Sequence, residues 1–339
     1  MRPSTWSNLS RLLLCSVLLM AGEAMLPVRS QAEELVLVEP VHYVGFLPYY
    51  VAFKQGFYRD EGIDFKTVTM DGGSQLVPTV ASGRAFALAA SVDRNAQAKV
   101  AGKVIKAVVN IDARANIYIM ARKGLVPANG DIAGLLKGKR IAVTAFGGTP
   151  NNMLRYLLNK WNLQPGKDVT LVEVSSTPLV LATMAAHQAD VGVSAEPFIT
   201  QGVAQGVWDE PIYAAKDLGP YTDTAISVSG DSISRNPKLV RGLVKAVIRG
   251  LIYTDSHRSE MLAFSKMEFP TASEADLKAS LDRTFADQIF SSDGFIPPEA
   301  WNLGDAVVRL GGVLKEPVSY DDVVDMQFVE SVQKELGHR

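Results

Sequence analysis

Short apolar runs alternate with helical patterns along the first hundred residues, and this alternation constrains the fold more than any other feature. Residues 35–38 form a continuous apolar run, which is typical of a strand buried on both faces of a parallel sheet. Residues 63–68 alternate with period two, and residues 86–90 form a third apolar run. Helical patterns over residues 49–55 and 76–83, each ended by glycine, separate these strands. The order predicts a parallel sheet covered by helices.

The same order recurs in the second third of the chain. Strands are expected over residues 139–143, 169–174 and 191–193, and helices over residues 150–161 and 179–186. Pro150 suits the first turn of a helix, where its missing N–H would have no partner. A crossing segment near residues 91–125 separates the two units. We therefore expect an α/β protein of two lobes, each a mainly parallel sheet flanked by helices, with a ligand cleft between them.

The last third of the chain is more helical. Apolar residues at helical spacing predict helices over residues 239–251, 275–285 and 320–336, and ordinary core packing accounts for these stripes. The expected organisation is a signal peptide at 1–32, the first part of lobe 1 at 33–120, lobe 2 at 121–225, and a C-terminal helical segment at 226–339 that completes lobe 1.

The N-terminus is typical of a cleavable secretory signal peptide. Arg2 and Arg11 precede an apolar run over residues 12–20, and residues 30–32 offer small side chains at the cleavage positions. A retained signal anchor or a buried N-terminal helix is the alternative. Cys15 lies inside the apolar run behind a leucine, which does not fit a lipoprotein site, and it is the only cysteine. The processed chain would therefore lack disulfides, cysteine-bound metals and a thiol nucleophile.

Charge and histidine spacing exclude several functions. Residues 1–32 carry three basic residues and one acidic residue, so cleavage lowers the formal net charge from −2 to about −4. No long basic block appears, which argues against a nucleic-acid partner. The four histidines, His42, His187, His257 and His338, form no helical pair or ligand cluster, so we expect no metal and no cofactor.

Four motifs resemble the periplasmic receptors of ABC importers that take up nitrate, taurine and alkanesulfonates, or pyrimidine precursors of thiamine. They are the proline–alanine pattern at 47–52 followed by the glycine–aromatic turn at 56–64, the motif at 136–143 followed by a small-residue loop and a helix, Ala189-Asp190 followed by Ser194-Ala195-Glu196-Pro197, and Asn236-Pro237 opening a helix. One departure concerns the position three residues after Gly83, where the family usually has aspartate and this chain has Phe86.

This resemblance implies a type II-like periplasmic binding protein that captures a small solute in the periplasm. It implies an ABC permease in the inner membrane as partner, a monomeric state and no catalytic activity. Two alternatives stay open. One is an enzyme similar to thiamine-pyrimidine synthases, which depend on a cysteine-rich segment and histidine. The other is a ligand-sensing partner of a signalling receptor.

Candidate ligand-binding residues lie in loops that follow strands, because open parallel sheets bind ligands outside the carboxyl ends of their strands. After the first strand, His42, Tyr43, Phe46 and Tyr49 form an aromatic loop that could enclose a planar or apolar ligand. The alternative is that these rings pack the lobe.

Two glycine-containing loops are candidates for holding an anion. In the first unit, Gly72 and Gly73 precede Ser74, which we expect to cap the helix that follows. In the second unit, Gly147 and Gly148 precede Thr149 at a helix start. Glycines let the backbone approach a ligand, and N–H groups at a helix start favour anions. Ordinary tight turns are the alternative for both loops.

Glu196 is the most specific single candidate, because it is expected at a strand end and could accept hydrogen bonds from an amine or amidine. A structural carboxylate is the alternative. Asp93 and Asn95, with Ser91 and Arg94, follow the third strand and could supply polar contacts or begin the crossing segment. Arg114 and Asn116 are weaker candidates.

The ligand itself stays open among a sulfonate, nitrate, an aromatic acid and a pyrimidine-like compound. Aromatic rings and Glu196 favour a planar nitrogen-containing or aromatic compound, whereas the glycine loops favour a small anion. An aromatic acid satisfies both sets of residues.

Overall fold

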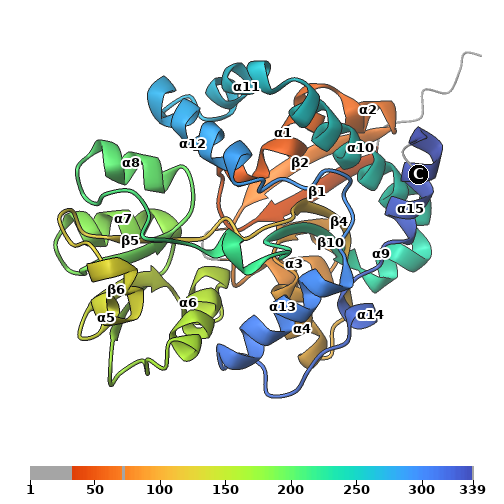
Figure 1. Ribbon diagram of the computed structural model, residues 1–339. Coiled ribbons are helices and arrows are strands. Elements are labelled where there is room, and N and C mark those ends of the chain that lie inside the picture. The colour runs from red at the N-terminus through yellow and green to blue at the C-terminus, as the bar shows by residue number, and fades with distance from the viewer. Residues whose placement is uncertain (1–32, 71–72, 338–339) are drawn as a thin grey trace, which may run out of the picture. The chain divides into compact units, whose positions relative to one another are not determined.

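A computed structural model describes residues 33–70 and 73–337, and these residues fold around two five-stranded mixed sheets (Figure 1). The first sheet has the order β2 (Ile63–Thr69), β1 (Glu33–Glu39), β3 (Ala87–Ala90), β10 (Thr224–Ser229) and β4 (Ile105–Asp112). The second has the order β7 (Thr170–Val174), β6 (Arg140–Thr144), β8 (Val191–Ser194), β5 (Tyr118–Ala121) and β9 (Tyr213–Ala214). The signal peptide predicted at residues 1–32 and the candidate Gly72 lie outside the described residues.

The two sheets share one pattern of strand directions. In the first sheet β1 runs parallel to β2 and β3, and β10 lies antiparallel between β3 and β4. In the second sheet β6 runs parallel to β7 and β8, and β5 lies antiparallel between β8 and β9. β5 precedes the rest of its sheet in sequence, whereas β10 follows all of the second sheet. The chain therefore passes between the sheets at 113–117 and again at 215–223.

Alternate residues of the strands pack on opposite faces of the first sheet. Leu35 and Leu37 of β1 pack in a cluster with α1 (Leu47–Lys54) and α10 (Pro237–Ser256), whereas Val38 packs with α3 (Leu76–Ala81) and α4 (Asp93–Val100). Burial on both faces explains why these strands are continuous apolar runs in the sequence. Shorter helices α2 (Phe57–Asp60), α9 (Gly230–Arg235) and α14 (Tyr320–Val323), and the longer α15 (Gln327–Leu336), complete this side of the molecule.

The second sheet is covered in the same way. Ile141 and Val143 of β6 pack in a cluster with the apolar stripe of α6 (Thr149–Lys160), whereas Ala142 packs in a cluster with α7 (Thr177–Ala185). Helices α5 (Ile132–Leu136) and α8 (Phe198–Ala204) also belong to this side. The two-lobed α/β fold with mainly parallel sheets is confirmed.

The C-terminal helices contact elements of both sheets. α11 (Met261–Glu268) packs against α12 (Glu274–Ala286), which also packs against α8. α13 (Pro298–Leu310) packs against α6. The segment expected to complete lobe 1 is thus also in contact with helices that flank the second sheet. The expected lobe limits near 120 and 225 fall inside β5 and β10, which belong wholly to the second and first sheets.

Three predictions about local structure were wrong. The crossing segment near 91–125 contains α4, β4 and β5, because its apolar run over 105–112 is a buried strand. Ser74 does not cap α3, whose N-cap residue is Gln75. The single helix expected over 320–336 is two helices, because Val324 is extended and forms a β-bridge with Ala107 beside β4.

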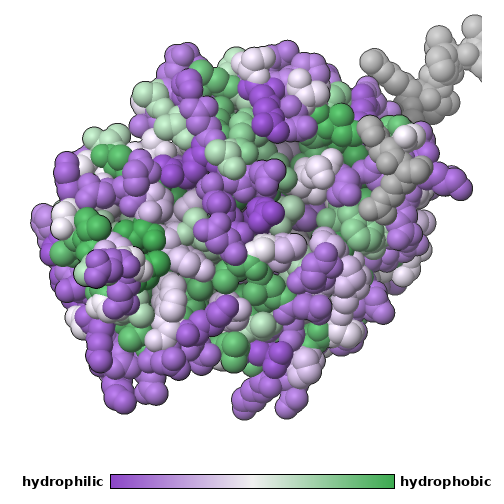
Figure 2. All heavy atoms as spheres, viewed as in Figure 1, coloured by the Kyte–Doolittle hydropathy of each residue, from purple (hydrophilic) through white to green (hydrophobic). Residues whose placement is uncertain are grey.

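The surface drawn in Figure 2 is mainly hydrophilic, with hydrophobic residues gathered in several small areas. Among residues 33–70 and 73–337, no helix has the length and apolar character that a membrane crossing requires. The same residues contain no group of three or more histidine, cysteine or acidic side chains placed to hold a metal ion.

Candidate functional site

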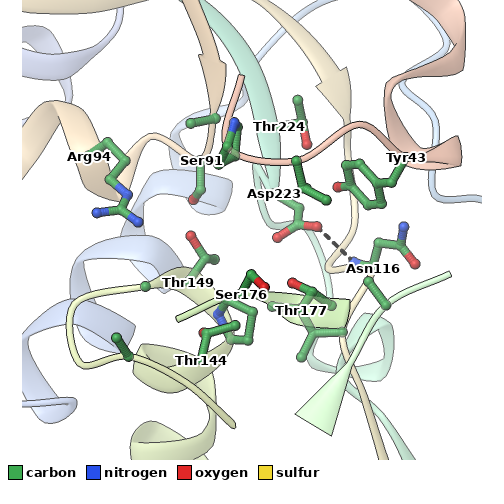
Figure 3. A pocket seen from close by; sticks show the side chains of 18 of the residues that line it. Tyr43, Ser91, Arg94, Asn116, Thr144, Thr149, Ser176, Thr177, Asp223 and Thr224 are labelled. Atoms are coloured by element: carbon green, nitrogen blue, oxygen red, sulfur yellow. Dashed lines mark hydrogen bonds between the residues drawn. The ribbon is translucent and has the colours of Figure 1, made fainter. Parts of the chain in front are cut away.

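A cavity of about 200 Å³ lies between the two sheets, and loops at the carboxyl ends of strands from both sheets form its wall (Figure 3). This is where an open parallel sheet is expected to bind ligands. The described residues that line it are Pro40, Val41, Tyr43, Phe46, Ser74, Ala90, Ser91, Arg94, Asn116, Ile117, Thr144, Ala145, Phe146, Gly148, Thr149, Pro150, Ser175, Ser176, Thr177, Ala195, Phe198, Asp223 and Thr224. The volume is below the range of about 300–1,000 Å³ that is usual for drug-sized ligands, so the cavity suits a small solute.

Two helix N-termini of the second sheet contribute hydroxyl groups to the wall. α6 begins at Thr149 with Gly148 as its N-cap residue, and α7 begins at Thr177 with Ser176 as its N-cap residue. Gly148 has no side chain to cap α6, and the Ser176 side chain does not cap α7. The positive ends of the two helix dipoles and the hydroxyl groups beside them therefore favour a negatively charged group in this part of the cavity.

Arg94 is the only cationic side chain that lines the cavity in the described part of the chain. It lies in the first turn of α4, is half-buried, and extends toward the cavity on the opposite side from Tyr43 (Figure 3). Its guanidinium group makes no hydrogen bond or ion pair with another described residue. The planar fork of N–H donors is suited to a carboxylate, sulfonate or nitrate.

Asp223 is the only acidic side chain in the same wall, again among the described residues. Its carboxylate is almost completely buried and accepts one hydrogen bond of 3.2 Å from the backbone N–H of Asn116. Burial raises the pKa of Asp223 to about 7, the Asn116 N–H lowers it, and the charge of Asp93 raises it. Burial also raises the pKa of the neighbouring Asp112 well above its ordinary value, and the charge of Asp223 adds to this effect.

Aromatic rings contribute to the apolar part of the wall. Tyr43 and Phe46 pack edge to face with ring centroids 4.5 Å apart, and Phe146 and Phe198 line the cavity from the second sheet. The Tyr43 ring lies directly over Gly45, where an added Cβ would come within 2.6 Å of the ring. Gly45 is therefore needed for Tyr43 to occupy this position, and any larger residue would move the ring.

Five of the predicted site residues lie in the cavity wall, namely Tyr43, Phe46, Ser74, Gly148 and Thr149. Gly73 adjoins the wall in a left-handed conformation, with Pro40 and Arg94 as its neighbours. The remaining six, His42, Tyr49, Asp93, Asn95, Gly147 and Glu196, are not part of the wall.

The His42 side chain points into a polar cluster instead of the cavity. Its Nδ1 lies 2.9 Å from Glu39 Oε1 and its Nε2 lies 3.4 Å from Glu268 Oε1. Burial alone would lower the pKa of His42, but hydrogen bonds to Glu268 and Glu39 outweigh it and raise the pKa to about 9. His42 therefore anchors the loop that carries Tyr43.

Tyr49 and Asn95 are core residues of the first lobe. Tyr49 is fully buried and packs against the rings of Phe46 and Tyr50. The Asn95 carboxamide donates to Ser227 Oγ and to the Val323 carbonyl, which ties α4 to β10 and α14. Both side chains are held away from the cavity by these contacts.

Asp93 and Gly147 connect elements of the two sheets. Asp93 Oδ2 accepts a hydrogen bond of 2.9 Å from Asn152 Nδ2, and Thr149 Oγ1 lies 3.4 Å from both Asp93 oxygens. The Gly147 carbonyl accepts from Gln97 Nε2 at 3.2 Å. These contacts join α4 to the start of α6 at the edge of the cavity.

Glu196 is fully buried beside the cavity and its carboxylate is used by protein groups. It accepts hydrogen bonds from Arg283 Nε at 2.7 Å, Ser280 Oγ at 3.1 Å and Thr200 Oγ1 at 3.0 Å. The Thr200 backbone N–H adds a fourth bond. Its partners on α12 make it a connection between the second sheet and the C-terminal segment. The candidate that the sequence favoured most thus has the contacts of a structural carboxylate.

The sequence analysis missed most of the polar residues that line the cavity from the second sheet. It also missed strand β10 and the lining residues at its start. The hydroxyl run Ser175–Ser176–Thr177 follows β7 and precedes Pro178, so the rule used for Gly147–Thr149 could have found it. Asp223 and Thr224 gave no signal, because β10 was not recognised as a strand. Ser91, Arg94 and Asn116, considered with less weight, are in the wall. Arg114 is not, and its guanidinium donates to the Lys216 carbonyl.

The chain matches one family model over residues 44–260, and it is similar to proteins named as binding proteins over most of its length. The sequence profile of a family described as NMT1/THI5 like matches residues 44–260. A protein named as a binding protein, YtlA of Bacillus subtilis (strain 168), is 21% identical over 97% of this chain and 99% of its own. The riboflavin-binding protein RibY of Chloroflexus aurantiacus is 26% identical over 84% of this chain and 83% of its own.

The fold is also similar to that of a solved binding protein. The alkanesulfonate-binding protein SsuA from Xanthomonas axonopodis pv. citri, bound to MOPS, superposes with a TM-score of 0.71. The match covers 88% of this chain and 99% of that protein at 17% identity, so it describes the fold alone.

Proposed function

The chain belongs to the NMT1/THI5-like family, and we propose that it is the substrate-binding component of an ABC importer. In this proposal it captures a small organic or anionic solute in the periplasm and delivers it to a permease in the inner membrane. One observation carries the proposal: the cavity lies between the two sheets and is lined from both sides. Among the described residues its wall contains one arginine, two helix N-termini and aromatic rings.

The contents of the wall favour an acid with an apolar or planar body. Arg94 and the hydroxyl groups at the starts of α6 and α7 offer donors to an anion, whereas Tyr43 and Phe46 offer faces and edges to a ring. A sulfonate, nitrate, an aromatic acid or a pyrimidine-like compound each uses part of this wall. An aromatic acid uses all of it.

The proposed mechanism is closure of two lobes around the ligand. We place the lobe limits in the connections at 113–117 and 215–223, because β5 and β10 lie beyond them in opposite sheets. Contacts such as Asp93 with Asn152 would form on closure, and ligand bound to both walls would shift the population toward the closed form. The importer would then recognise the closed surface of a monomer, and no nucleic acid takes part.

We propose binding without turnover. The only cysteine is Cys15, in the predicted signal peptide, and no histidine lines the cavity among the described residues. The alternative of a synthase that depends on cysteine and histidine therefore has no support in this wall. A protein that senses its ligand on behalf of a signalling receptor would close around the ligand in the same way. Ligand-stimulated ATP hydrolysis by the reconstituted importer distinguishes transport from such sensing.

A thermal-shift screen of the chain from Glu33 onward tests the function. The ligands are alkanesulfonates, nitrate, aromatic carboxylates, pyrimidines and flavins. A true ligand at a hundred times its Kd should stabilise the protein by about 2.7 kcal/mol, seen as a higher Tm. It should be recovered chemically unchanged after incubation, and it should stimulate ATP hydrolysis by the importer reconstituted in vesicles. No shift with any ligand, or conversion of a ligand to product, would contradict the proposal.

A further inference from the structure

We propose that the protein has a second ligand site, separate from the cavity between the sheets. The site is a pocket of about 330 Å³ beside the connections that join the two sheets. Its ligand is a small neutral compound that carries several hydroxyl groups on an apolar ring, as a monosaccharide or a cyclic polyol does. This inference goes beyond the proposed function, because it concerns other residues and another class of ligand.

Three segments that are far apart in the sequence form the pocket. The last turns of α10 and α12 provide two sides, the segment 288–292 provides the third, and Ala113 completes the wall. None of these lining residues also lines the cavity between the sheets. The volume lies within the range of about 300–1,000 Å³ that is usual for small-molecule sites, so the pocket is large enough for a sugar-sized compound.

The pocket offers a ligand no unpaired charge in the part of the chain that the structure describes. Its charged residues, Asp255 and Arg258, bond to each other, with Arg258 Nε 3.1 Å from Asp255 Oδ1. The Arg258 guanidinium also lies over the Phe285 ring, 4.8 Å from its centroid. Arg94 in the first cavity has no such partner. An acid would have to compete with Asp255 for Arg258, so the second pocket suits a neutral ligand.

A buried hydroxyl group without a partner indicates that this ligand carries hydroxyl groups. Thr254 of α10 lines the pocket and is 1% exposed, and its Oγ1 has no hydrogen-bond partner among the described residues. In the same pocket, Thr284 donates to the Ser280 carbonyl one turn back along α12 at 2.8 Å. Thr254 makes no such bond along α10. A ligand hydroxyl can both donate to Thr254 and accept from it, which removes the cost of the unpartnered group.

The remaining walls combine apolar surface with neutral polar groups. Phe285 and Phe290 pack edge to face with ring centroids 5.7 Å apart, and Leu251 adjoins them in the wall. Gln288 and Ser292 add an amide and a hydroxyl group from the third side. The C–H face of a sugar ring can pack on the aromatic rings while its hydroxyl groups meet the polar side chains.

The pocket also adjoins the bonds that hold the two connections together. The Ala113 N–H donates to the Ile289 carbonyl at 2.8 Å, and the Ala113 carbonyl accepts from the Tyr221 N–H at 3.0 Å. Ala113 therefore links the connection at 113–117 to the returning chain at 215–223. A ligand in the pocket should keep these bonds closed, so hydrogen exchange at the Ala113 and Tyr221 amides reports whether the pocket is occupied.

Isothermal titration calorimetry with four neutral probes tests the inference on the chain from Glu33 onward. The probes are D-ribose, D-glucose, D-galactose and myo-inositol. At least one should bind saturably, with a Kd of about 1 mM or lower. The same probe should slow hydrogen–deuterium exchange in the peptides that contain Ala113 and Tyr221.

Two variants localise the binding, and a third is the control. Thr254→Val replaces the hydroxyl with a methyl group and should weaken binding about threefold to tenfold, without lowering stability in urea, because the hydroxyl has no partner to lose. Ser292→Trp changes an exposed residue of the wall, fills the pocket and should abolish both binding and exchange protection. Ser265→Ala removes an equally buried, unpartnered hydroxyl of α11 outside the pocket and should leave binding unchanged.

The inference is wrong if none of the four probes binds saturably. It is also wrong if either pocket variant binds the probe as wild type does, or if exchange slows only in other peptides, because the probe then binds elsewhere. The thermal-shift screen with acids does not involve this pocket. Ser292→Trp should keep the Tm shift of any acid found in that screen, so the proposed function and this inference stand or fail separately.

Discussion

Two buried carboxylate regions of this protein are built from the same residue types and are connected in opposite ways. At the junction of the second sheet with α12, Glu196 and Arg283 bond to each other, and Ser280 and Thr200 supply the remaining donors. In the cavity wall, Asp223 and Arg94 stay apart, with one hydrogen bond to Asp223 and none to the Arg94 guanidinium among the described residues.

This difference teaches how to tell a structural charge from a functional one. A buried charge is costly unless protein groups satisfy it, and Glu196 meets that condition completely. Asp223 does not, and its raised pKa is the consequence. The residue type and the burial are alike in the two regions, so the hydrogen-bond count decides the assignment.

The largest effect should come from breaking the satisfied region. Glu196→Ala leaves Arg283, Ser280 and Thr200 without their acceptor, and we expect a loss of about 3 kcal/mol in the free energy of unfolding. Urea denaturation at pH 7 measures it. Glu210→Ala is the matched control, because Glu210 bonds the same Arg283 from an exposed position and should cost about 0.5 kcal/mol or less. Equal costs for the two variants would contradict the comparison.

Removing the carboxylate of Asp223 in the cavity wall should raise the free energy of unfolding, whereas Glu196→Ala lowers it. The pKa of Asp223 is raised, so the folded state holds its proton where the unfolded state has lost it, and wild-type stability falls as the pH rises from about 4 to about 7. Asp223→Asn removes this loss. Without ligand, the variant should be more stable than wild type by about 2 kcal/mol at pH 8 and nearly equal to it at pH 4.

Denaturant titrations at the two pH values measure this difference, with Asp231→Asn as the exposed control. A variant that is less stable than wild type at pH 8 would mean that the Asp223 carboxylate is satisfied within the protein. The distinction between the two regions would then be lost.

Arg94→Gln tests whether Arg94, in contrast to Arg283, contributes to ligand binding and not to stability. Loss of the guanidinium should weaken binding of an acidic ligand found in the screen by about tenfold or more, since a hydrogen bond between charged groups is worth roughly 1.5–3 kcal/mol. Chemical denaturation should show little change, because no described residue bonds to Arg94. Arg94→Lys should recover only part of the affinity, because an ammonium cannot donate a planar pair of bonds. A variant that binds the acid normally would remove Arg94 from the site.

The sequence predicted the fold well because each sheet is buried on both faces, which leaves apolar runs such as 35–38 and 191–193. It failed where structure depends on distant pairing. β10 is recognised as a strand only by its position between β3 and β4, and Val324 interrupts a helical pattern because it pairs with Ala107. The same limit applies to the site. Tyr43 and Thr149 follow local strand ends, whereas Asp223 reaches the cavity through the returning chain.

Burial and bonding of Glu196 were equally invisible in the sequence. Its position after β8 suggested a ligand contact, but Ser280 and Arg283, which bond it, are more than eighty residues away. A rule based on strand ends finds the neighbourhood of a site. It cannot decide which of the carboxylates there already has partners.

The smallest expected effect concerns His42, a partly buried side chain whose two ring nitrogens both have partners and which titrates. Its ring bonds Glu39 and Glu268, and Glu39 also accepts from Tyr50 and Thr69. The pKa of His42 is raised to about 9 in the folded state, so its stabilising contribution is complete below about pH 6.5 and is lost as the pH rises through about 9. The side chain is about one-third exposed, at 35%, and solvent screening reduces the contribution.

His42→Gln, which keeps an N–H donor without the charge, should therefore lower the free energy of unfolding by about 1 kcal/mol at pH 6 and by almost nothing at pH 10. Denaturation at both pH values measures the change, and a cost that is independent of pH would show that the neutral ring alone holds the loop that carries Tyr43.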